Sequence, residues 1–271
     1  MPELPEVETS RKGLEPHIIG RKVTALVVRY WQLRWPIPRD LPALLAGHKL
    51  QAVERRGKYL ILRFSHGCAL IHLGMSGSVR IVNMSELVAK HDHFDICFDA
   101  GKVLRYTDPR RFGSLLWVAG EVAEHELIRH LGPEPLSDEF DWRYLYQRSR
   151  KRKQALKTFI MDSKLVVGVG NIYANEALFA SGIKPIRLAG KLTKAEAKCL
   201  VDNIKRVLAR AIEQGGTTLK DFVGGDGKPG YFAQELMVYG RGGQPCVRCD
   251  KPLKEIRIAQ RATVYCTQCQ K

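Results

Sequence analysis

Four cysteines near the C-terminal end have the spacing of a metal site. They form two C-x₂-C pairs, Cys246 with Cys249 and Cys266 with Cys269. Four thiolates make the tetrahedral all-sulfur set that a structural zinc ion prefers. Two disulfides or four unrelated thiols are the alternative, but a C-x₂-C loop favours chelation and the chain shows no sign of secretion. One structural Zn²⁺ is therefore expected, and a site closed by four thiolates folds the tail without performing chemistry.

Positive charge surrounds this predicted zinc finger. The segment between the cysteine pairs can form the two strands of a hairpin, and basic residues lie on or beside it: Arg241, Arg248, Lys251, Lys254, Arg257 and Arg261. The chain as a whole has a formal net charge of +16. Such an excess favours a polyanionic partner, and clustered Lys and Arg residues make nucleic acid the first candidate.

Other classes of protein fit the composition less well. Membrane-surface proteins are also basic, but there is no apolar run of about 18 residues, no signal-peptide core and no basic amphipathic anchor. The remaining cysteines, Cys68, Cys97 and Cys199, are isolated in the sequence. They fit a reducing compartment, so a cytoplasmic protein without membrane attachment is expected.

The elements that must position these residues change character along the chain. Residues 3–19 are expected to form a helix with Pro5 in its first turn and acidic residues at its positive end. From residue 22 to about 118, short segments alternate between apolar and polar residues or run apolar, which predicts antiparallel strands in a sandwich or flattened barrel. After residue 132, apolar spacing predicts four helices, at 142–149, 154–161, 172–180 and 193–213. A glycine-rich stretch follows from residue 215 to 230.

These patterns predict an α+β multidomain protein in three parts. Residues 1–131 would form an antiparallel β-sandwich with an N-terminal helix. Residues 132–235 would form a helical domain with the glycine-rich loop, and residues 236–271 the zinc-finger hairpin.

Five segments make the sequence resemble one known family. They are the N-terminal MPELPEVE, LGMSG at residues 73–77, DPRRFG at 108–113, GVGN at 168–171 and the four-cysteine tail with its QRAT at 260–263. In this order, over essentially the whole chain, they resemble the bacterial formamidopyrimidine-DNA glycosylases. The resemblance implies a base-excision repair enzyme that removes oxidised purines, such as 8-oxoguanine and formamidopyrimidines, from duplex DNA. It also implies cleavage of the abasic strand, a central helix–two-turn–helix domain and a protein that acts as a monomer.

The N-terminus makes chemical sense of this resemblance. Initiator Met is generally removed before a small residue, which leaves Pro2 as a terminal secondary amine. Terminal amines titrate at about 7.7–8.0, well below lysine, so more free base is present at neutral pH. Such an amine can attack a sugar C1′, and the resulting iminium ion acidifies C2′ and permits β-elimination of the 3′ phosphate. Without the resemblance, a plain helix-start role for Pro2 would be the simpler interpretation.

Three further residues complete the catalytic set that the resemblance implies. Glu3 would shuttle protons near the sugar oxygen, although a carboxylate there also suits a helix dipole. Lys58 would point into the active site as a phosphate or base contact and proton donor. Arg261, on the finger, would grip phosphates that flank the damaged nucleotide and assist the second elimination.

Chemistry on a base inside a duplex requires its extrusion. Met75, Arg110 and Phe112 match the residues that this family inserts into the vacated stack, an apolar wedge and a guanidinium for the orphaned base. Core packing would be the ordinary interpretation of Met75 and Phe112, but turns seldom face inward.

Phosphate contacts and lesion recognition are also implied. His91, Arg110, Arg152 and Asn171 match DNA-contact positions, and Asn171 is expected to cap a helix whose start attracts anions. The lesion pocket would involve Glu6, Thr217, Thr218 and Tyr231, on the helix start and in the 217–231 loop.

Two other functions remain open at this stage. An enzyme of the endonuclease VIII type shares the fold and chemistry but excises oxidised pyrimidines, and the Leu4, Val7-Glu8 and 217–221 segments favour the purine branch instead. A non-catalytic zinc-ribbon DNA-binding protein would leave the N-terminus without a role.

Overall fold

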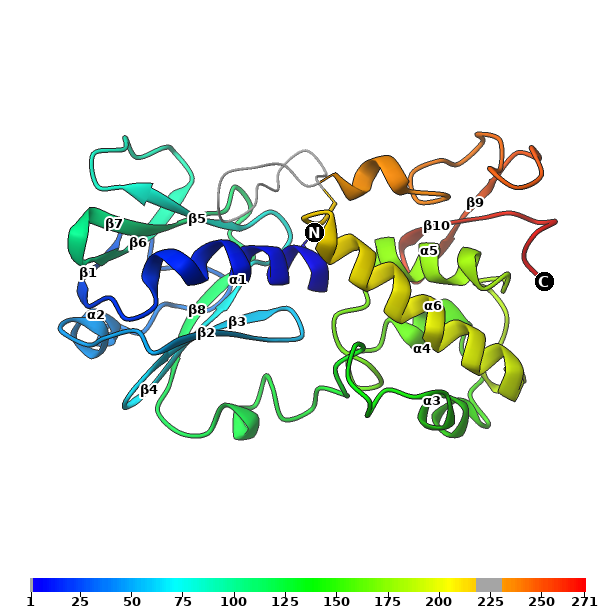
Figure 1. Cartoon of the computed structure of the whole chain (residues 1–271), viewed down its shortest axis with the longest axis horizontal. Helices are drawn as coiled ribbons and strands as arrows, with labels where there is room; N and C mark the ends of the chain where they lie inside the picture. The colour runs from blue at the N-terminus through cyan, green and yellow to red at the C-terminus, as the bar shows by residue number, and fades with distance from the viewer. Residues whose placement is uncertain (1, 218–230) are drawn as a thin grey trace. The chain divides into compact units, whose positions relative to one another are not determined.

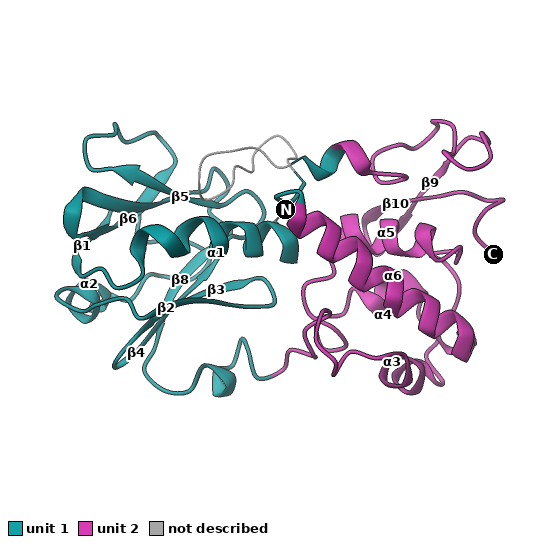
Figure 2. Ribbon diagram, viewed as in Figure 1, with its two compact units in different colours: residues 1–129, 214–233 teal, residues 130–213, 234–271 magenta. Residues whose placement is uncertain are grey.

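The computed structural model describes residues 2–217 and 231–271, which form two compact units. Unit 1 comprises residues 1–129 and 214–233, and unit 2 comprises residues 130–213 and 234–271 (Figure 2). Among the described residues, none of the helices is both long and apolar enough to span a membrane.

Unit 1 contains two antiparallel sheets of four strands each (Figure 1). One has the order β1-β6-β7-β5, built from β1 (Val23–Val28), β5 (Ser78–Asn83), β6 (Asp92–Phe98) and β7 (Lys102–Thr107). The other has the order β2-β3-β4-β8, built from β2 (Ala52–Arg56), β3 (Tyr59–Phe64), β4 (Gly67–His72) and β8 (Ser114–Val118). Every neighbouring pair is antiparallel, so the predicted antiparallel sandwich is confirmed.

The core of unit 1 follows from the two-residue period of its strands. Leu60, Leu62 and Phe64 of β3 and Phe94 and Ile96 of β6 belong to one apolar cluster. Alternate side chains of a strand point to the same face, so each sheet turns one apolar face toward this common core. The cluster also takes in residues of helices α1 (Leu4–Ile18) and α2 (Leu41–Leu45). Helix α1 contacts strands of both sheets, which fixes the helix against the sandwich.

Unit 2 combines helices with one hairpin. Its helices are α3 (Trp142–Ser149), α4 (Leu156–Ile160), α5 (Asn171–Ala180) and α6 (Lys194–Glu213). Asp141 begins α3 by accepting a 2.7 Å hydrogen bond from the backbone N–H of Tyr144. The hairpin consists of β9 (Lys254–Ile258) and β10 (Arg261–Tyr265), the two strands predicted between the cysteine pairs. Short 3₁₀ turns occur in both units: Asp99–Gly101, Val122–Glu124, Ala189–Lys191 and Phe232–Glu235.

Two details of the predicted helices need correction. Asn171 does not cap α5, because Gly170 is the N-cap residue and Asn171 lies in the first helical position. Helix α4 spans Leu156–Ile160 and is shorter than the predicted 154–161. The division into three domains, with boundaries after residues 131 and 235, stays a prediction.

Candidate active site and nucleic-acid interface

The start of α1 gathers two carboxyl groups beside Pro2. Pro2 is buried, and Glu3 and Glu6 are only 1% and 2% exposed. Glu3 is the N-cap residue of α1 and Glu6 its third helical residue, which is the spacing of a capping box. The backbone N–H of Glu3 donates to Glu6 Oε2 at 2.8 Å. The helix start therefore holds Glu3 in a fixed backbone conformation directly next to the candidate amine.

Glu6 also reaches the segment that enters the glycine-rich loop. Its Oε1 accepts a 2.8 Å hydrogen bond from the backbone N–H of Thr217. Gly216 makes this approach possible, since its φ is +80° and a Cβ there would lie 3.1 Å from Glu6 Oε1. Thr217 is bridged to Tyr231, whose side chain is 58% exposed. Glu6, Thr217 and Tyr231 are thus brought together at the base of the loop, whereas Thr218 lies outside the described residues.

Lys58 occupies the tight turn between β2 and β3. Arg56 pairs with Tyr59, so Gly57 and Lys58 are the two residues of the turn. A residue that sequence reasoning missed, His72 at the end of β4, feels the charge of Lys58. Burial, followed by the charges of Lys58 and Arg34, lowers the pKa of His72 to about 4. This imidazole is therefore neutral at physiological pH, and its Nδ1 accepts a 3.0 Å hydrogen bond from the backbone N–H of Gly74.

The three candidate insertion residues lie on two loops of unit 1. Met75 and Phe112 are 41% and 43% exposed, which is high for large apolar side chains outside the core. The Arg110 guanidinium lies 4.7 Å from the centre of the Phe112 ring. These loops therefore expose two large apolar side chains, and one of them, the Phe112 ring, has a cation against it.

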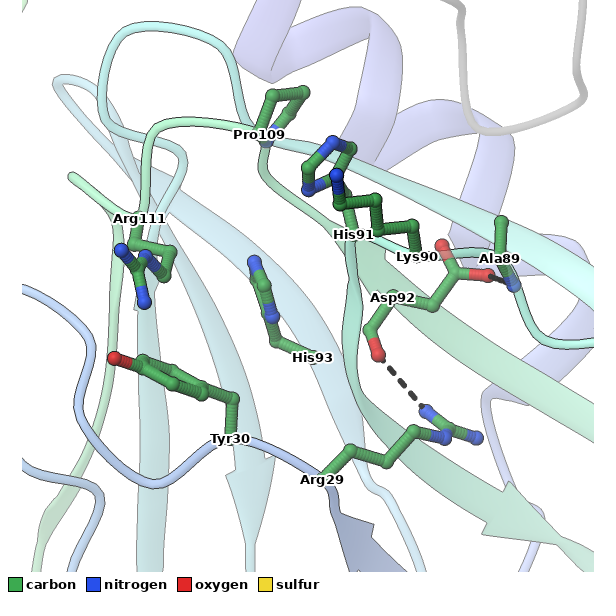
Figure 3. Close-up of a pocket in the computed structure, with 9 residues that line it drawn as sticks. All are labelled: Arg29, Tyr30, Ala89, Lys90, His91, Asp92, His93, Pro109 and Arg111. Atoms are coloured by element: carbon green, nitrogen blue, oxygen red, sulfur yellow. Dashed lines mark hydrogen bonds between the residues drawn. The ribbon is translucent and has the colours of Figure 1, made fainter.

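A basic pocket of about 390 Å³ lies beside these loops, and His91 lines it. Its other lining residues are mostly cationic or aromatic: Arg29, Tyr30, Ala89, Lys90, Asp92, His93, Pro109 and Arg111. Figure 3 shows Arg111 above the ring of Tyr30, with the His93 ring beside them. Asp92 is turned toward the backbone N–H of Ala89, to which it is bonded at 2.8 Å. The pocket as a whole suits an anionic ligand such as a phosphate.

The four predicted ligands of the zinc finger converge in unit 2. Their sulfur atoms all lie within 4.8 Å of one another, with Cys246 Sγ 3.9 Å from Cys269 Sγ and Cys249 Sγ 3.5 Å from Cys266 Sγ. Zinc–sulfur bonds of about 2.3 Å in a tetrahedron place the sulfurs roughly 3.8 Å apart. The donor set and its spacing therefore fit one structural Zn²⁺, as predicted.

Polar side chains, those of Lys157 and Asn175 buried and that of Asn171 half-buried, fasten the finger hairpin to the helices of unit 2. Lys157, only 1% exposed, donates from Nζ to the Ala262 carbonyl at 2.8 Å and to Thr263 Oγ1 at 2.7 Å. Asn175 Oδ1 accepts from the backbone N–H of Val264 at 2.9 Å, and Asn171 Nδ2 donates to the Ala262 carbonyl at 3.1 Å. Strand β10 is therefore held along most of its length.

This fastening determines where Arg261 lies. Arg261 is the first residue of β10 after a turn in which Ala259 and Gln260 both have positive φ. Its side chain is exposed and lines a pocket of about 200 Å³ together with Lys157 and Met161. Arg152 is exposed as well, and Gly190 donates a backbone hydrogen bond to its carbonyl. Pro2, Glu3 and Lys58 belong to unit 1, whereas Arg152, Asn171 and Arg261 belong to unit 2.

Glu176 is another residue of unit 2 that sequence reasoning missed. It is 4% exposed and accepts backbone hydrogen bonds from Met237, Val238 and Tyr239 at 2.8–3.0 Å. Burial raises the pKa of Glu176, although these three bonds act in the opposite direction. The Glu176 carboxyl group therefore fixes residues 237–239, which lead from the 3₁₀ turn Phe232–Glu235 to the zinc finger.

Three family models match the chain in sequence order. They are the formamidopyrimidine-DNA glycosylase N-terminal domain at residues 1–115, the H2TH domain of the same enzymes at residues 131–223, and the zinc finger found in FPG and IleRS at residues 243–271. The formamidopyrimidine-DNA glycosylase of Cellvibrio japonicus is 64% identical over 270 residues, which is 100% of both chains. The enzyme of the same name from Saccharophagus degradans is 60% identical over 271 residues, again 100% of both.

Solved structures give the same result. A mutant Lactococcus lactis FPG in complex with Fapy-dG containing DNA is 33% identical, with a TM-score of 0.93 over 100% of both chains. The MutM (FPG) protein of Thermus thermophilus is 37% identical, with a TM-score of 0.89 over 99% of this chain and 98% of that one. From the N-terminal residues to the zinc finger, this chain belongs to the formamidopyrimidine-DNA glycosylase family.

Proposed function

We propose that this chain excises oxidised purines from duplex DNA and then cleaves the abasic strand through a Schiff base on Pro2. The observation that carries the proposal is the start of α1, where two buried carboxyl groups lie next to the candidate amine. A helix cap alone needs neither the burial of both groups nor the link from Glu6 to Thr217. The family relationship supports the same chemistry.

The proposed reaction begins at Pro2 once Met1 has been removed. The amine attacks C1′ of the damaged nucleoside and displaces the base, and Glu3 supplies general acid–base assistance near the sugar oxygen. The iminium ion then permits loss of the 3′ phosphate, and a second elimination releases the 5′ phosphate. Lys58 and Arg261 provide positive charge for the departing phosphates.

DNA binding is proposed to use surfaces on each unit. In unit 1 the basic pocket around His91 and the insertion residues Met75, Arg110 and Phe112 would contact the duplex. In unit 2 the contacts would come from Arg152, the start of α5 with Asn171, and Arg261 on the zinc-held hairpin. We also propose that the protein acts as a monomer in the cytoplasm, associated with the nucleoid through DNA.

Lesion choice is proposed to favour oxidised purines. The two ends of the 217–231 segment are held together by the bridge between Thr217 and Tyr231, and Glu6 holds the Thr217 end through its hydrogen bond. The structures similar to this one include Lactococcus lactis FPG with Fapy-dG DNA and also with DNA that contains an oxidised pyrimidine. The pyrimidine substrate therefore needs to be compared directly.

The test uses matched duplexes that carry 8-oxoguanine, an oxidised pyrimidine or an intact guanine at one position. Incubation with borohydride should trap a one-to-one covalent adduct on the 8-oxoguanine duplex, and peptide mapping should place it on Pro2. The intact duplex should give none. Faster trapping on the pyrimidine duplex would assign the chain to the endonuclease VIII type, and an adduct on Lys58 would refute the role of Pro2.

A further inference from the structure

Asp108 is a fully buried carboxylate that bonds to both insertion loops. These loops are residues 73–77, which carry Met75, and residues 108–113, which carry Arg110 and Phe112. Asp108 is 0% exposed. Its Oδ1 accepts from Ser76 Oγ at 2.7 Å and from the Arg110 backbone N–H at 3.1 Å. Its Oδ2 accepts from the Tyr106 hydroxyl and the Gly113 backbone N–H, each at 3.0 Å.

The four donors come from three places in the sequence. Ser76 belongs to the first loop, Arg110 and Gly113 to the second, and Tyr106 to strand β7 in the core. Burial and Asp108 raise the pKa of Tyr106, so its hydroxyl keeps the proton that it donates. The main chain of Asp108 is fixed as well, because its carbonyl accepts from His93 Nε2 at 2.7 Å and its N–H donates to the His91 carbonyl at 3.0 Å.

The backbones of the two loops are also in direct contact. A Cβ on Gly74 would lie 2.5 Å from the Phe112 carbonyl carbon and from the Gly113 nitrogen. Gly74 also has a φ of +67°. Both the lack of space for a Cβ and the positive φ favour glycine at this position. Each loop also contains a backbone hydrogen bond of its own. In the first loop the Gly77 N–H donates to the Leu73 carbonyl at 2.9 Å, and in the second the Arg111 N–H donates to the Asp108 carbonyl at 3.3 Å. The Ser76–Asp108 bond therefore links two turns that are each already formed.

We propose that Asp108 is a positioning residue that couples the two insertion loops, so that Met75 and Phe112 enter the DNA as one rigid unit. The inference rests on the proposed function and deepens its base-extrusion step. Asp108 itself is fully buried, so we expect no direct contact between its carboxylate and DNA. It acts through Ser76 on one loop and through the Arg110 and Gly113 backbone on the other.

Physical reasons favour a rigid unit over two independent loops. Unstacking a base step is costly, and a wedge offsets that cost only when it is already in place. Each independently moving loop would have to be ordered during insertion, which adds an entropic cost to the step. A charge-assisted hydrogen bond inside the protein is among the stronger ways to remove that freedom beforehand. A misplacement of about 1 Å in a reacting assembly can slow a reaction roughly a hundredfold.

The direct test is Ser76→Ala, which removes the side-chain hydrogen bond between the loops and leaves the other three donors to Asp108. Ser114→Ala is the matched control. Ser114 is buried on neighbouring β8, and its Oγ has no hydrogen-bond partner among the described residues. Single-turnover excision from a paired 8-oxoguanine duplex should slow about tenfold in Ser76→Ala. Cleavage of a pre-formed abasic site should change less than about threefold, because it needs no extrusion of a paired base.

A double-mutant cycle separates coupling from simple loss of stability. Met75→Ala and Phe112→Ala should have strongly non-multiplicative effects on excision in the native background, because the two wedges act together. In the Ser76→Ala background the two effects should become independent. Ser76→Thr, which keeps the hydroxyl, should restore most of the rate, and thermal melting should show that all the variants compared are folded.

The outcomes distinguish this inference from the proposed function. If the native chain releases no 8-oxoguanine, the proposed function itself fails. If the native chain is active but Ser76→Ala behaves like Ser114→Ala, the coupling role of Asp108 is refuted. Equal losses on the paired and abasic substrates, or unchanged coupling between Met75 and Phe112, would likewise reduce Asp108 to a support of the fold.

Discussion

The starts of helices α1 and α5 are the same structural element used in opposite ways. The first turn of α1 contains Glu6, and its N-cap residue is Glu3, so buried carboxyl groups of the protein occupy the positive end of that helix. The first turn of α5 contains no acidic residue, and its N-cap is Gly170, which has no side chain. Each helix has a dipole that attracts negative charge to its N-terminus.

The difference shows how the same dipole can serve chemistry or binding. At α1 the attraction is satisfied internally, so an incoming phosphate would meet two carboxyl groups and be repelled. That end can instead hold proton-transferring groups beside an amine. At α5 the first turn contains no carboxylate that would compete with a phosphate for the positive end of the helix. A DNA phosphate can therefore supply the negative charge there. Changes at α1 should therefore alter the chemical steps, whereas changes at α5 should alter affinity.

The largest effect is expected from blocking the amine beside α1. A chain with one extra residue before Pro2 should lose both excision and borohydride trapping almost completely, because an amide nitrogen is not a nucleophile. Affinity for a duplex that contains an uncleavable abasic analogue should change little. Trapping and filter binding measure the two properties separately. An extended chain that still traps DNA at the native rate would show that another amine reacts.

Next in size is Glu3→Gln, which tests the carboxyl group and leaves the backbone cap in place. General acid–base assistance is typically worth about 10²–10⁴-fold. Excision of 8-oxoguanine should slow by that factor, whereas cleavage at a pre-formed abasic site should retain much of its rate, since its aldehyde needs no departing base. The control is Glu15→Gln near the other end of the same helix, where the side chain is 44% exposed. If Glu3→Gln excised 8-oxoguanine at the native rate, Glu3 would have no role in proton transfer and would serve only as the N-cap of α1.

The parts of this architecture that the sequence predicts correctly depend on local patterns. The cysteine spacing, the strand period and the helix spacing each involve residues a few positions apart, and the structure confirms them. The sequence pattern does not single out strands β2 and β8 within the β-rich region, and both lie at the edges of their sheet. An edge strand tolerates polar residues such as those of AVERR in β2, so the pattern of β2 is weak.

The supporting hydrogen bonds could not be predicted because their partners are far apart in sequence. Asp108 and Ser76 are 32 residues apart, Lys157 and Thr263 are 106 apart, and Glu6 and Thr217 are 211 apart. Nothing near Lys157 marks it as buried, because the oxygens that stabilise its charge come from the finger. The roles assigned to individual site residues remain predictions for the same reason.

Loss of the zinc site should have a smaller effect, confined to the binding side of the comparison. Cys249→Ser should release zinc and disorder the hairpin that presents Arg261. A charged hydrogen bond is worth about 1.5–3 kcal/mol, so losing this contact should weaken DNA binding roughly tenfold to a hundredfold. Cys199→Ser, at an exposed cysteine of α6, is the control. Metal analysis and DNA titration measure both consequences, and native affinity in a zinc-free protein would contradict the assignment.

The smallest effect is expected at the start of α5, and salt dependence makes it measurable. Asn171→Ala removes a neutral amide that donates to the Ala262 carbonyl at 3.1 Å. Asn171 is also a proposed DNA contact, and one neutral hydrogen bond is worth about 1 kcal/mol. Losing that contact should weaken affinity about fivefold on damaged and undamaged duplexes alike. The slope of log affinity against log salt should stay the same, because no cation is lost. Arg261→Ala should instead reduce that slope by about 0.9. If Asn171→Ala changed excision at saturating DNA and left affinity intact, the division between a chemical helix start and a binding one would be wrong.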